Sequence, residues 1–164
     1  MLSKSILKEM NEQIKHEFYS AYLYLSMAAY AESINMAGVA NWYHIQAGEE
    51  LEHGMKFFEH IVERGEKVEL LAIDKPVVNF PSVKATFDQS YEHELKVTAR
   101  INLIYNLAVQ EKDYASQIFL QWFITEQVEE EKNASEIVGM LKMIGDNVNG
   151  LFALDHQLSK RKKE

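Results

Sequence analysis

Glu50 and His53 stand three residues apart within the segment 48–53, a spacing that suits shared metal binding. Residues three apart on a helix project from the same side, one turn above the other. A carboxylate and an imidazole placed in this way can hold one metal ion between them. Taken alone the pair is a weak signal, because Glu and His at this spacing are common on solvated helix faces. Its weight depends on whether other segments supply further ligands.

Three further acids, Glu17, Glu94 and Glu130, fall on stripes of apolar residues that recur every three or four positions. This periodicity predicts four amphipathic helices, and Glu17, Glu50, Glu94 and Glu130 each lie near the middle of the inward face of one of them. The stripes are Met10, Ile14, Glu17, Ala21, Tyr24 and Ala28; Tyr43, Ala47, Glu50, Gly54, Phe57 and Ile61; Val83, Phe87, Ser90 or Tyr91, Glu94, Val97, Ile101 and Ile104; and Phe119, Phe123, Glu126, Glu130, Asn133, Ile137, Met140 and Ile144.

Both prolines of the chain lie in the connection 66–81, which separates two helical blocks. Proline breaks helices, and so long a connection suggests a crossover that runs the length of a bundle. The first block divides near residues 33–38. The second begins at Ser82, a favourable N-cap, and divides at Lys112 and Asp113. A short fifth amphipathic helix is predicted over residues 147–160.

These elements predict one all-α domain over residues 1–164, a four-helix bundle in up-down-down-up order. Counting from the turns places the acids at one depth. Glu94 lies 18 residues before Lys112, and Glu130 lies 18 after it. Counted in the same way from the first turn, at Asn35, Glu17 and His53 also lie at matching distances. These counts are consistent with the acids and His53 meeting in one layer across the bundle.

Burying several carboxylates together is unfavourable unless they are protonated, paired with Lys or Arg, or bound to a cation. The stripes supply no Lys or Arg at this level, which favours a metal. Carboxylates with one imidazole suit iron, manganese or zinc, and two ions sharing a bridging Glu is a reasonable stoichiometry. The basic segment 160–163 is expected to be a solvated terminal tail. A metal-free bundle with satisfied acids is the remaining structural alternative.

The composition is that of an acidic globular protein without disulfides. The chain has 164 residues, a net charge of −8 and no cysteine. A phosphate backbone needs a basic face, so no nucleic-acid partner is expected. No run of about 18 apolar residues predicts a membrane span, and the N-terminus lacks the pattern of a secretory signal. We therefore expect a cytoplasmic protein that does not bind membranes.

Four stretches together resemble the non-haem bacterial ferritins: NEQIKHEFYSAYLYLSMAAY, AGEELEHGMKFFEHI, YEHELKVTARIN and FLQWFITEQVEEE. The likeness covers nearly the whole chain and implies a ferritin-like four-helix bundle, with a long crossover between helices 2 and 3 and a short fifth helix. It also implies two irons at a ferroxidase centre. Their ligands would be Glu17, Glu50 and His53 for the first iron, and bridging Glu50, Glu94 and Glu130 for the second, with Gln127 close by.

The resemblance further implies a third iron site beside the ferroxidase centre, formed by Glu49, Glu126, Glu129 and Glu130. Tyr24 and Trp122 match aromatic positions next to the two irons, where Tyr24 would supply an electron or steer the oxygen chemistry. Haem is not expected. The axial methionine of haem-containing relatives is replaced by Leu51, and Asn133 stands where their second Glu-x-x-His would end.

The implied function is oxidation of Fe(II) by dioxygen or hydrogen peroxide and storage of Fe(III) as hydrated oxide inside a homo-oligomeric shell of about 24 subunits. The alternative is a diiron oxidase or peroxidase that detoxifies iron and peroxide without large-scale storage. Both use the same carboxylates, so assembly into a shell is what distinguishes them.

Overall fold

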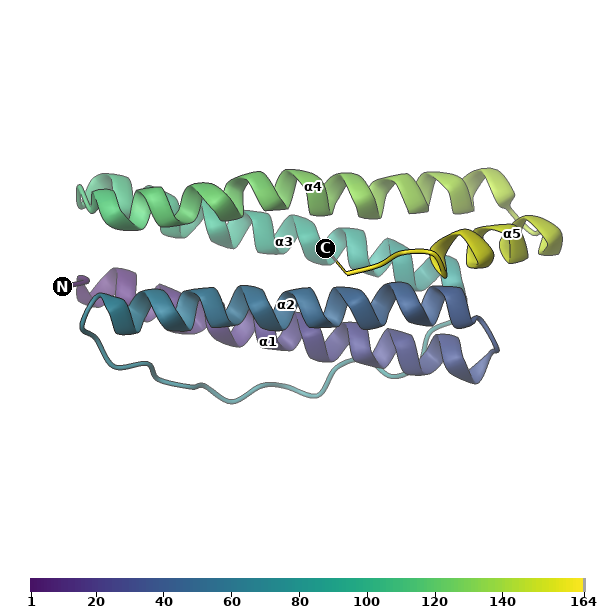
Figure 1. Cartoon of the computed structure of the whole chain (residues 1–164), viewed down its shortest axis with the longest axis horizontal. Helices are drawn as coiled ribbons and strands as arrows, with labels where there is room; N and C mark the ends of the chain where they lie inside the picture. The colour runs from purple at the N-terminus through teal and green to yellow at the C-terminus, as the bar shows by residue number, and fades with distance from the viewer. Residues whose placement is uncertain (164) are drawn as a thin grey trace.

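The computed structural model describes residues 1–163, which contain five helices and no β-strand. They are α1 (Lys4–Ser33), α2 (Ala37–Glu63), α3 (Val83–Gln110), α4 (Tyr114–Ile144) and α5 (Val148–Leu158). The first four lie side by side as a bundle, with α1 antiparallel to α2 and α3 antiparallel to α4 (Figure 1). The predicted all-α class and helix order are confirmed. Within residues 1–163, none of the helices combines the length and the apolar character needed to cross a membrane.

Local sequence explains where the long helices begin and turn. The side chains of Ser82 and Asp113 accept hydrogen bonds from backbone N–H groups in the first turns of α3 and α4, at 3.1 and 3.2 Å. Asn35 and Lys112, in the two tight turns, adopt positive φ angles of 59° and 57°. This left-handed conformation reverses the chain sharply, and Asn tolerates it better than most residues. Both turns lie where the sequence predicted them.

The crossover between α2 and α3 runs along the outside of the first helix pair, as Figure 1 shows. Two hydrogen bonds fasten it to α1. The Glu69 N–H donates to Asn11 Oδ1 at 2.9 Å, and the Ser26 hydroxyl donates to the Val77 carbonyl at 2.6 Å. Because the crossover returns the chain to the opposite end, α3 runs parallel to α2. Both helix pairs can then align their central acids at one depth.

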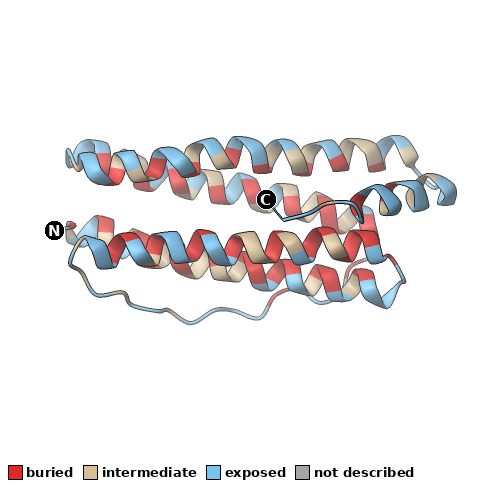
Figure 2. Cartoon of the chain, in the orientation of Figure 1, coloured by how far each residue is buried: buried red, intermediate tan, exposed pale blue. Residues whose placement is uncertain are grey.

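Two apolar clusters form the core, one towards each end of the bundle, and a buried polar layer lies between them. One cluster contains Tyr24, Tyr43 and Phe87, and the other contains Ile14 and Phe57. Figure 2 shows the buried residues gathered along the facing sides of the four long helices. The polar layer consists of Gln13, Glu17, Ser20, Gln46, Glu50, His53, Ser90, Glu94, Gln127 and Glu130.

The inward face of α4 differs from the predicted stripe. Phe123, Glu130 and Ile137 are buried as expected, but Gln127 is buried where Glu126 was predicted to be. The buried residues are Ser116, Leu120, Phe123, Gln127, Glu130, Ala134, Ile137 and Leu141. Phe123, Glu130 and Ile137 are seven residues apart, and a helical stripe through them can continue through either Glu126 or Gln127. Both of these stripes contain further apolar residues. Periodicity alone therefore could not show which of the two faces of α4 is buried.

Helix α5 packs against the start of α2, and the chain after it turns back along α2 (Figure 1). The Val39 N–H donates to Asp155 Oδ1 at 2.8 Å. A Cβ atom at Gly38 would lie 1.7 Å from the Asp155 carbonyl oxygen, so this close approach requires glycine. Asn41 Nδ2 then donates to the carbonyls of Leu158 and Arg161, each at 3.2 Å. The expectation of a solvated basic tail is wrong at Arg161, which packs on α2.

Replacing Gly38 by alanine should displace α5, because the new methyl group meets a backbone atom that no side-chain rotation can move. We expect Gly38→Ala to destabilise the protein by about 1–3 kcal/mol and to speed hydrogen exchange in residues 148–158. Gly139→Ala is the matched control, since its Cβ would meet no atom within 4 Å. That control should be neutral or stabilising, and equal melting temperatures for the two variants would contradict the packing described.

Candidate metal centre

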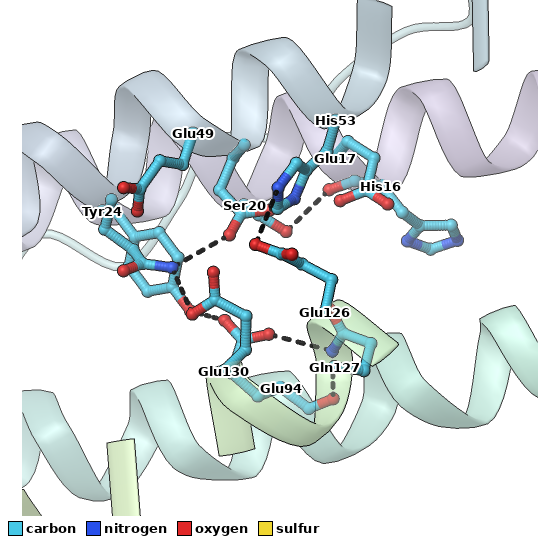
Figure 3. Close-up of polar contacts among 12 residues, drawn as sticks. His16, Glu17, Ser20, Tyr24, Glu49, His53, Glu94, Glu126, Gln127 and Glu130 are labelled. Atoms are coloured by element: carbon cyan, nitrogen blue, oxygen red, sulfur yellow. Dashed lines mark hydrogen bonds and ion pairs between the residues drawn. The ribbon is translucent and has the colours of Figure 1, made fainter. Parts of the chain in front are cut away.

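Four glutamates and one histidine from four different helices converge in the middle of the bundle. Figure 3 labels four of them, Glu17, His53, Glu94 and Glu130. We call these five residues the carboxylate layer: Glu17 from α1, Glu50 and His53 from α2, Glu94 from α3 and Glu130 from α4. None is more than 5% exposed. The structure thus brings together the acids whose positions the sequence predicted at one depth.

Glu17, Glu50 and His53 form the tightest group in the layer. Each offers a ligand atom, and these atoms lie within 4.8 Å of one another. His53 Nδ1 is 3.6 Å from Glu50 Oε2. Glu17 Oε2 and Glu50 Oε2 are buried without a hydrogen-bond partner among residues 1–163. Buried polar atoms are almost always satisfied, so two open carboxylate oxygens beside an imidazole fit a cation that would bind all three groups.

Glu94 and Glu130 complete the layer from the second helix pair. The Tyr24 hydroxyl donates to Glu94 Oε1. The Gln127 amide donates to Glu94 Oε2 at 3.2 Å. Gln46 Nε2 donates to Glu130 Oε2 at 2.7 Å and to Glu50 Oε1 at 3.3 Å. Glu50 is therefore linked to both halves of the layer, the position that a bridging ligand needs.

Two glutamines hold the carboxylates in place, and the sequence reasoning missed both. Gln13 Nε2 donates to Glu17 Oε1 at 2.9 Å, and Gln46 makes the equivalent bond to Glu50. Each glutamine is fully buried and stands four residues before its glutamate. Residues four apart are neighbours on a helix surface. The repeated Gln-x-x-x-Glu spacing was the signal that could have revealed them.

The acids predicted for a third iron site are only partly gathered. His53, Glu126 and Glu130 offer ligand atoms within 4.8 Å of one another. Glu49 lies on the same side of the layer, but its carboxylate pairs with Arg161 Nη2 at 2.6 Å. Glu129 is exposed on α4. Of the acids predicted for the third iron site, Glu126 and Glu130 are therefore close enough to share a cation, whereas the carboxylate of Glu49 is paired with Arg161.

The two predicted aromatic residues border the layer in different ways. Tyr24 is fully buried, and burial and the Glu94 charge raise the pKa of its hydroxyl well above the usual value. It is therefore a protonated donor to Glu94 at neutral pH. Trp122 is 40% exposed and meets the His53 ring edge-on, with 5.3 Å between ring centroids. Its ring also contacts the Lys56 ammonium, 4.6 Å from the centroid.

Burial and mutual repulsion keep protons on the carboxylate layer when no cation is present. Burial raises the pKa of Glu17 and Glu50 well above the usual value, and neighbouring carboxylates add to both shifts. Burial also raises the pKa of Glu94. For Glu130, burial and then the Glu94 charge raise the pKa to about 8, and Glu49 adds in the same direction. A cation in the layer would reverse these shifts, because it favours the ionised acids.

A separate groove lies between α1 and α3. It encloses about 860 Å³ and is lined by residues such as Lys15, His16, His93 and Arg100. Burial lowers the pKa of His93 to about 4, so this imidazole is neutral at physiological pH. Its Nε2 lies 2.7 Å from the Ser20 hydroxyl. The groove is open and mixed in charge, whereas the layer is enclosed and acidic.

Comparison with known proteins agrees with this geometry. The profile of the ferritin-like domain family matches residues 7–144. The bacterial non-haem ferritin of Staphylococcus aureus is 40% identical over 161 residues, covering 98% of this chain and 97% of that protein. The Staphylococcus haemolyticus protein of the same name is equally similar, at 40% over 161 residues. Among solved structures, an open-pore ferritin from the archaeon Archaeoglobus fulgidus superposes with a TM-score of 0.98 at 46% identity, covering 99% of this chain and 100% of that one.

The raised pKa values make the stability of the metal-free protein depend on pH. Between about 4.5 and about 8, folded Glu130 keeps a proton that the unfolded chain has released. The contribution of Glu130 to the free energy of unfolding is therefore fully present at the low-pH end of this window and is lost as the pH rises through it. A loss of about 3 kcal/mol would lower the melting temperature by roughly 6–12 °C. Calorimetry of the metal-free protein at pH 5 and pH 8 measures this difference.

Glu130→Gln should weaken this pH dependence, because the amide needs no proton to stay neutral in the layer. Glu136→Gln is the control, since Glu136 is exposed on the same helix. Saturating Zn(II) should also reverse the trend by binding the ionised carboxylates of the folded state. A melting temperature that increases from pH 5 to pH 8 without metal would contradict the described electrostatics.

Proposed function

This chain belongs to the ferritin-like family and is a homologue of the bacterial non-haem ferritins, and from that premise we propose that the carboxylate layer is its ferroxidase centre. Membership implies iron storage with ferroxidase activity, in which Fe(II) is the substrate. We assign Glu17, Glu50 and His53 to one iron. We assign bridging Glu50, Glu94 and Glu130 to the other, with Gln127 beside it.

The observation that carries the proposal is the pair of open oxygens, Glu17 Oε2 and Glu50 Oε2, beside His53. Lysine or arginine would have satisfied these oxygens in a metal-free structural bundle, but the buried layer contains neither. Iron accepts both carboxylate and imidazole ligands. The same layer holds four acids and one imidazole, enough to place two irons with Glu50 between them.

Binding Fe(II) requires the layer to release its protons, because only ionised carboxylates are ligands. The amides of Gln13 and Gln46 donate to the carboxylates throughout and keep their second oxygens directed at the iron positions. Two ferrous ions held side by side supply two electrons together, which reduce dioxygen to hydrogen peroxide with the uptake of two protons. Carboxylate ligands then stabilise the ferric product. We propose that Tyr24, whose hydroxyl is hydrogen-bonded to Glu94, supplies an electron to the oxidant or steers the oxygen chemistry.

We further propose that the chain assembles into a closed homo-oligomeric shell of about 24 subunits, works in the cytoplasm as a single domain over residues 1–164, and stores the oxidised iron as hydrated oxide. A third iron would bind at Glu49, Glu126, Glu129 and Glu130 during transfer towards the store. Haem is not part of this proposal, because Leu51 and Asn133 replace the residues that haem-containing relatives use.

Removing the bridging carboxylate should abolish rapid iron oxidation. Losing even an indirect partner of a metal ligand costs roughly 10–100-fold in affinity or activity, so we expect Glu50→Ala to slow the initial aerobic oxidation of Fe(II) by at least that factor. The ferric absorbance after mixing with two Fe(II) per subunit measures the rate. Glu59→Ala is the matched control, an exposed glutamate on the same helix. If Glu50→Ala oxidised iron as fast as Glu59→Ala, the assignment of the centre would be wrong.

The size of the particle separates storage from detoxification alone. A storage shell should sediment as a particle of about 24 chains and should keep far more ferric ions soluble than its ferroxidase centres can hold, after repeated additions of Fe(II). A diiron oxidase or peroxidase without storage would sediment as a small oligomer and precipitate the ferric product. Analytical ultracentrifugation with an iron assay on the soluble fraction distinguishes the two, and a dimer that precipitates iron would overturn the storage proposal.

A further inference from the structure

The C-terminal tail places a cation against the outer side of the carboxylate layer. The guanidinium of Arg161 contacts Glu49 Oε2 through Nη2 at 2.6 Å and donates from Nη1 to Gln46 Oε1 at 2.9 Å. It stacks over the Trp42 ring, 4.8 Å from the centroid. The two charged side chains are only 21% and 17% exposed. Three contacts on one helix therefore hold this arginine in a single position.

Gln46 connects this arginine to the iron ligands. Its carbonyl oxygen accepts from Arg161, while its amide nitrogen donates to Glu130 Oε2 at 2.7 Å and to Glu50 Oε1. Arginine is only a donor, so it fixes which end of the amide faces outwards. The donor end must then face the carboxylates. Arg161 thus lies two hydrogen bonds from both Glu50 and Glu130.

Resting on the proposed function, we propose that Arg161 is a built-in counter-cation of the third iron site. It neutralises Glu49 until an iron ion displaces it, and it positions Gln46 towards the inner carboxylates. A carboxylate oxygen held at 2.6 Å by a guanidinium is a poor ligand for a second cation at the same place. An incoming iron and Arg161 therefore compete for Glu49, and iron at the third site releases the tail from α2.

The partial burial of the pair makes this competition stronger than at an ordinary surface ion pair. Exposed pairs contribute little because water screens them. This pair lies against the Trp42 ring beside the buried amide of Gln46, where screening is weaker. The neighbouring tail contact, between Lys163 and Glu52, joins two exposed side chains, so it has no comparable effect. Arg161 is thus the tail residue that links the end of the chain to the metal site.

Equilibrium titration of the metal-free protein with Zn(II), which is redox-inert, tests the competition directly. We expect Arg161→Gln still to bind two zinc ions per subunit at the inner carboxylates, but more weakly than the parent protein, because Arg161 no longer holds Gln46 in place. The third should bind about tenfold more tightly, because coupling between two sites typically changes affinity by roughly 5–150-fold. Lys162→Gln is the matched control, since it removes the same charge from the adjacent, exposed position. That control should change the third affinity less than about twofold at physiological salt.

A second measurement uses the unaltered chain and does not depend on how the variants fold. Zinc beyond two per subunit should speed hydrogen exchange in residues 159–163 severalfold, because coupling between the tail and the third metal must be reciprocal. A purely structural arginine would give exchange that does not respond to the third zinc.

The outcomes separate this inference from the proposed function. If the parent fails to bind two zinc ions per subunit, the ferroxidase centre itself is wrong. If the parent binds two but the third affinity is unchanged in Arg161→Gln, or changes equally in Lys162→Gln, the competition at Glu49 is wrong and the centre stands. Tail exchange that stays constant while a third zinc binds would also overturn it.

Discussion

Everything in this structure depends on placing four carboxyl groups in one dry layer. Such a layer is unstable as four anions, since each loses hydration and repels the others. The fold tolerates it because two apolar clusters, one on either side, supply the packing that holds the helices at fixed separation. Protons neutralise the layer when it is empty, and a cation replaces them when it binds. The unfavourable burial of the carboxylates therefore favours the binding of multivalent cations.

The glutamine amides orient the carboxylates before any cation binds. Gln13 satisfies one oxygen of Glu17 and leaves the other open, and Gln46 does the same for Glu50. Each carboxylate is thus held in one rotamer by a neutral donor that does not compete for the metal position. A lysine at either place would hold the acid equally well but would add a positive charge beside the incoming ion. Preorganisation of this kind reduces the ordering that binding would otherwise require.

Much of the arrangement of the inner acids could be predicted from the sequence, because it depends on the local periodicity of apolar residues along each helix. Each inner acid replaces an apolar residue on its own helix, and the turns at Asn35 and Lys112 fix the relative depth of each helix pair. The face of α4 was less determined, since residues on both sides of the line through Phe123 and Glu130 are apolar, and packing made the choice. Contacts of the tail could not be inferred at all. Arg161 meets Glu49 only after α5 has turned the chain back, across 112 residues of sequence.

The tail also changes how charge is balanced across the site. The inner acids have no Lys or Arg partner within the layer, so protons or metal must neutralise them, and an incoming cation displaces only protons there. Glu49, at the edge, has a permanent positive charge beside it, so a metal binds there only at the expense of that contact. Affinity for cations therefore decreases from the inner layer to its rim. Under the proposed assignment, a gradient of this direction would retain two ions where they react together and would make the third position a place of passage for the product.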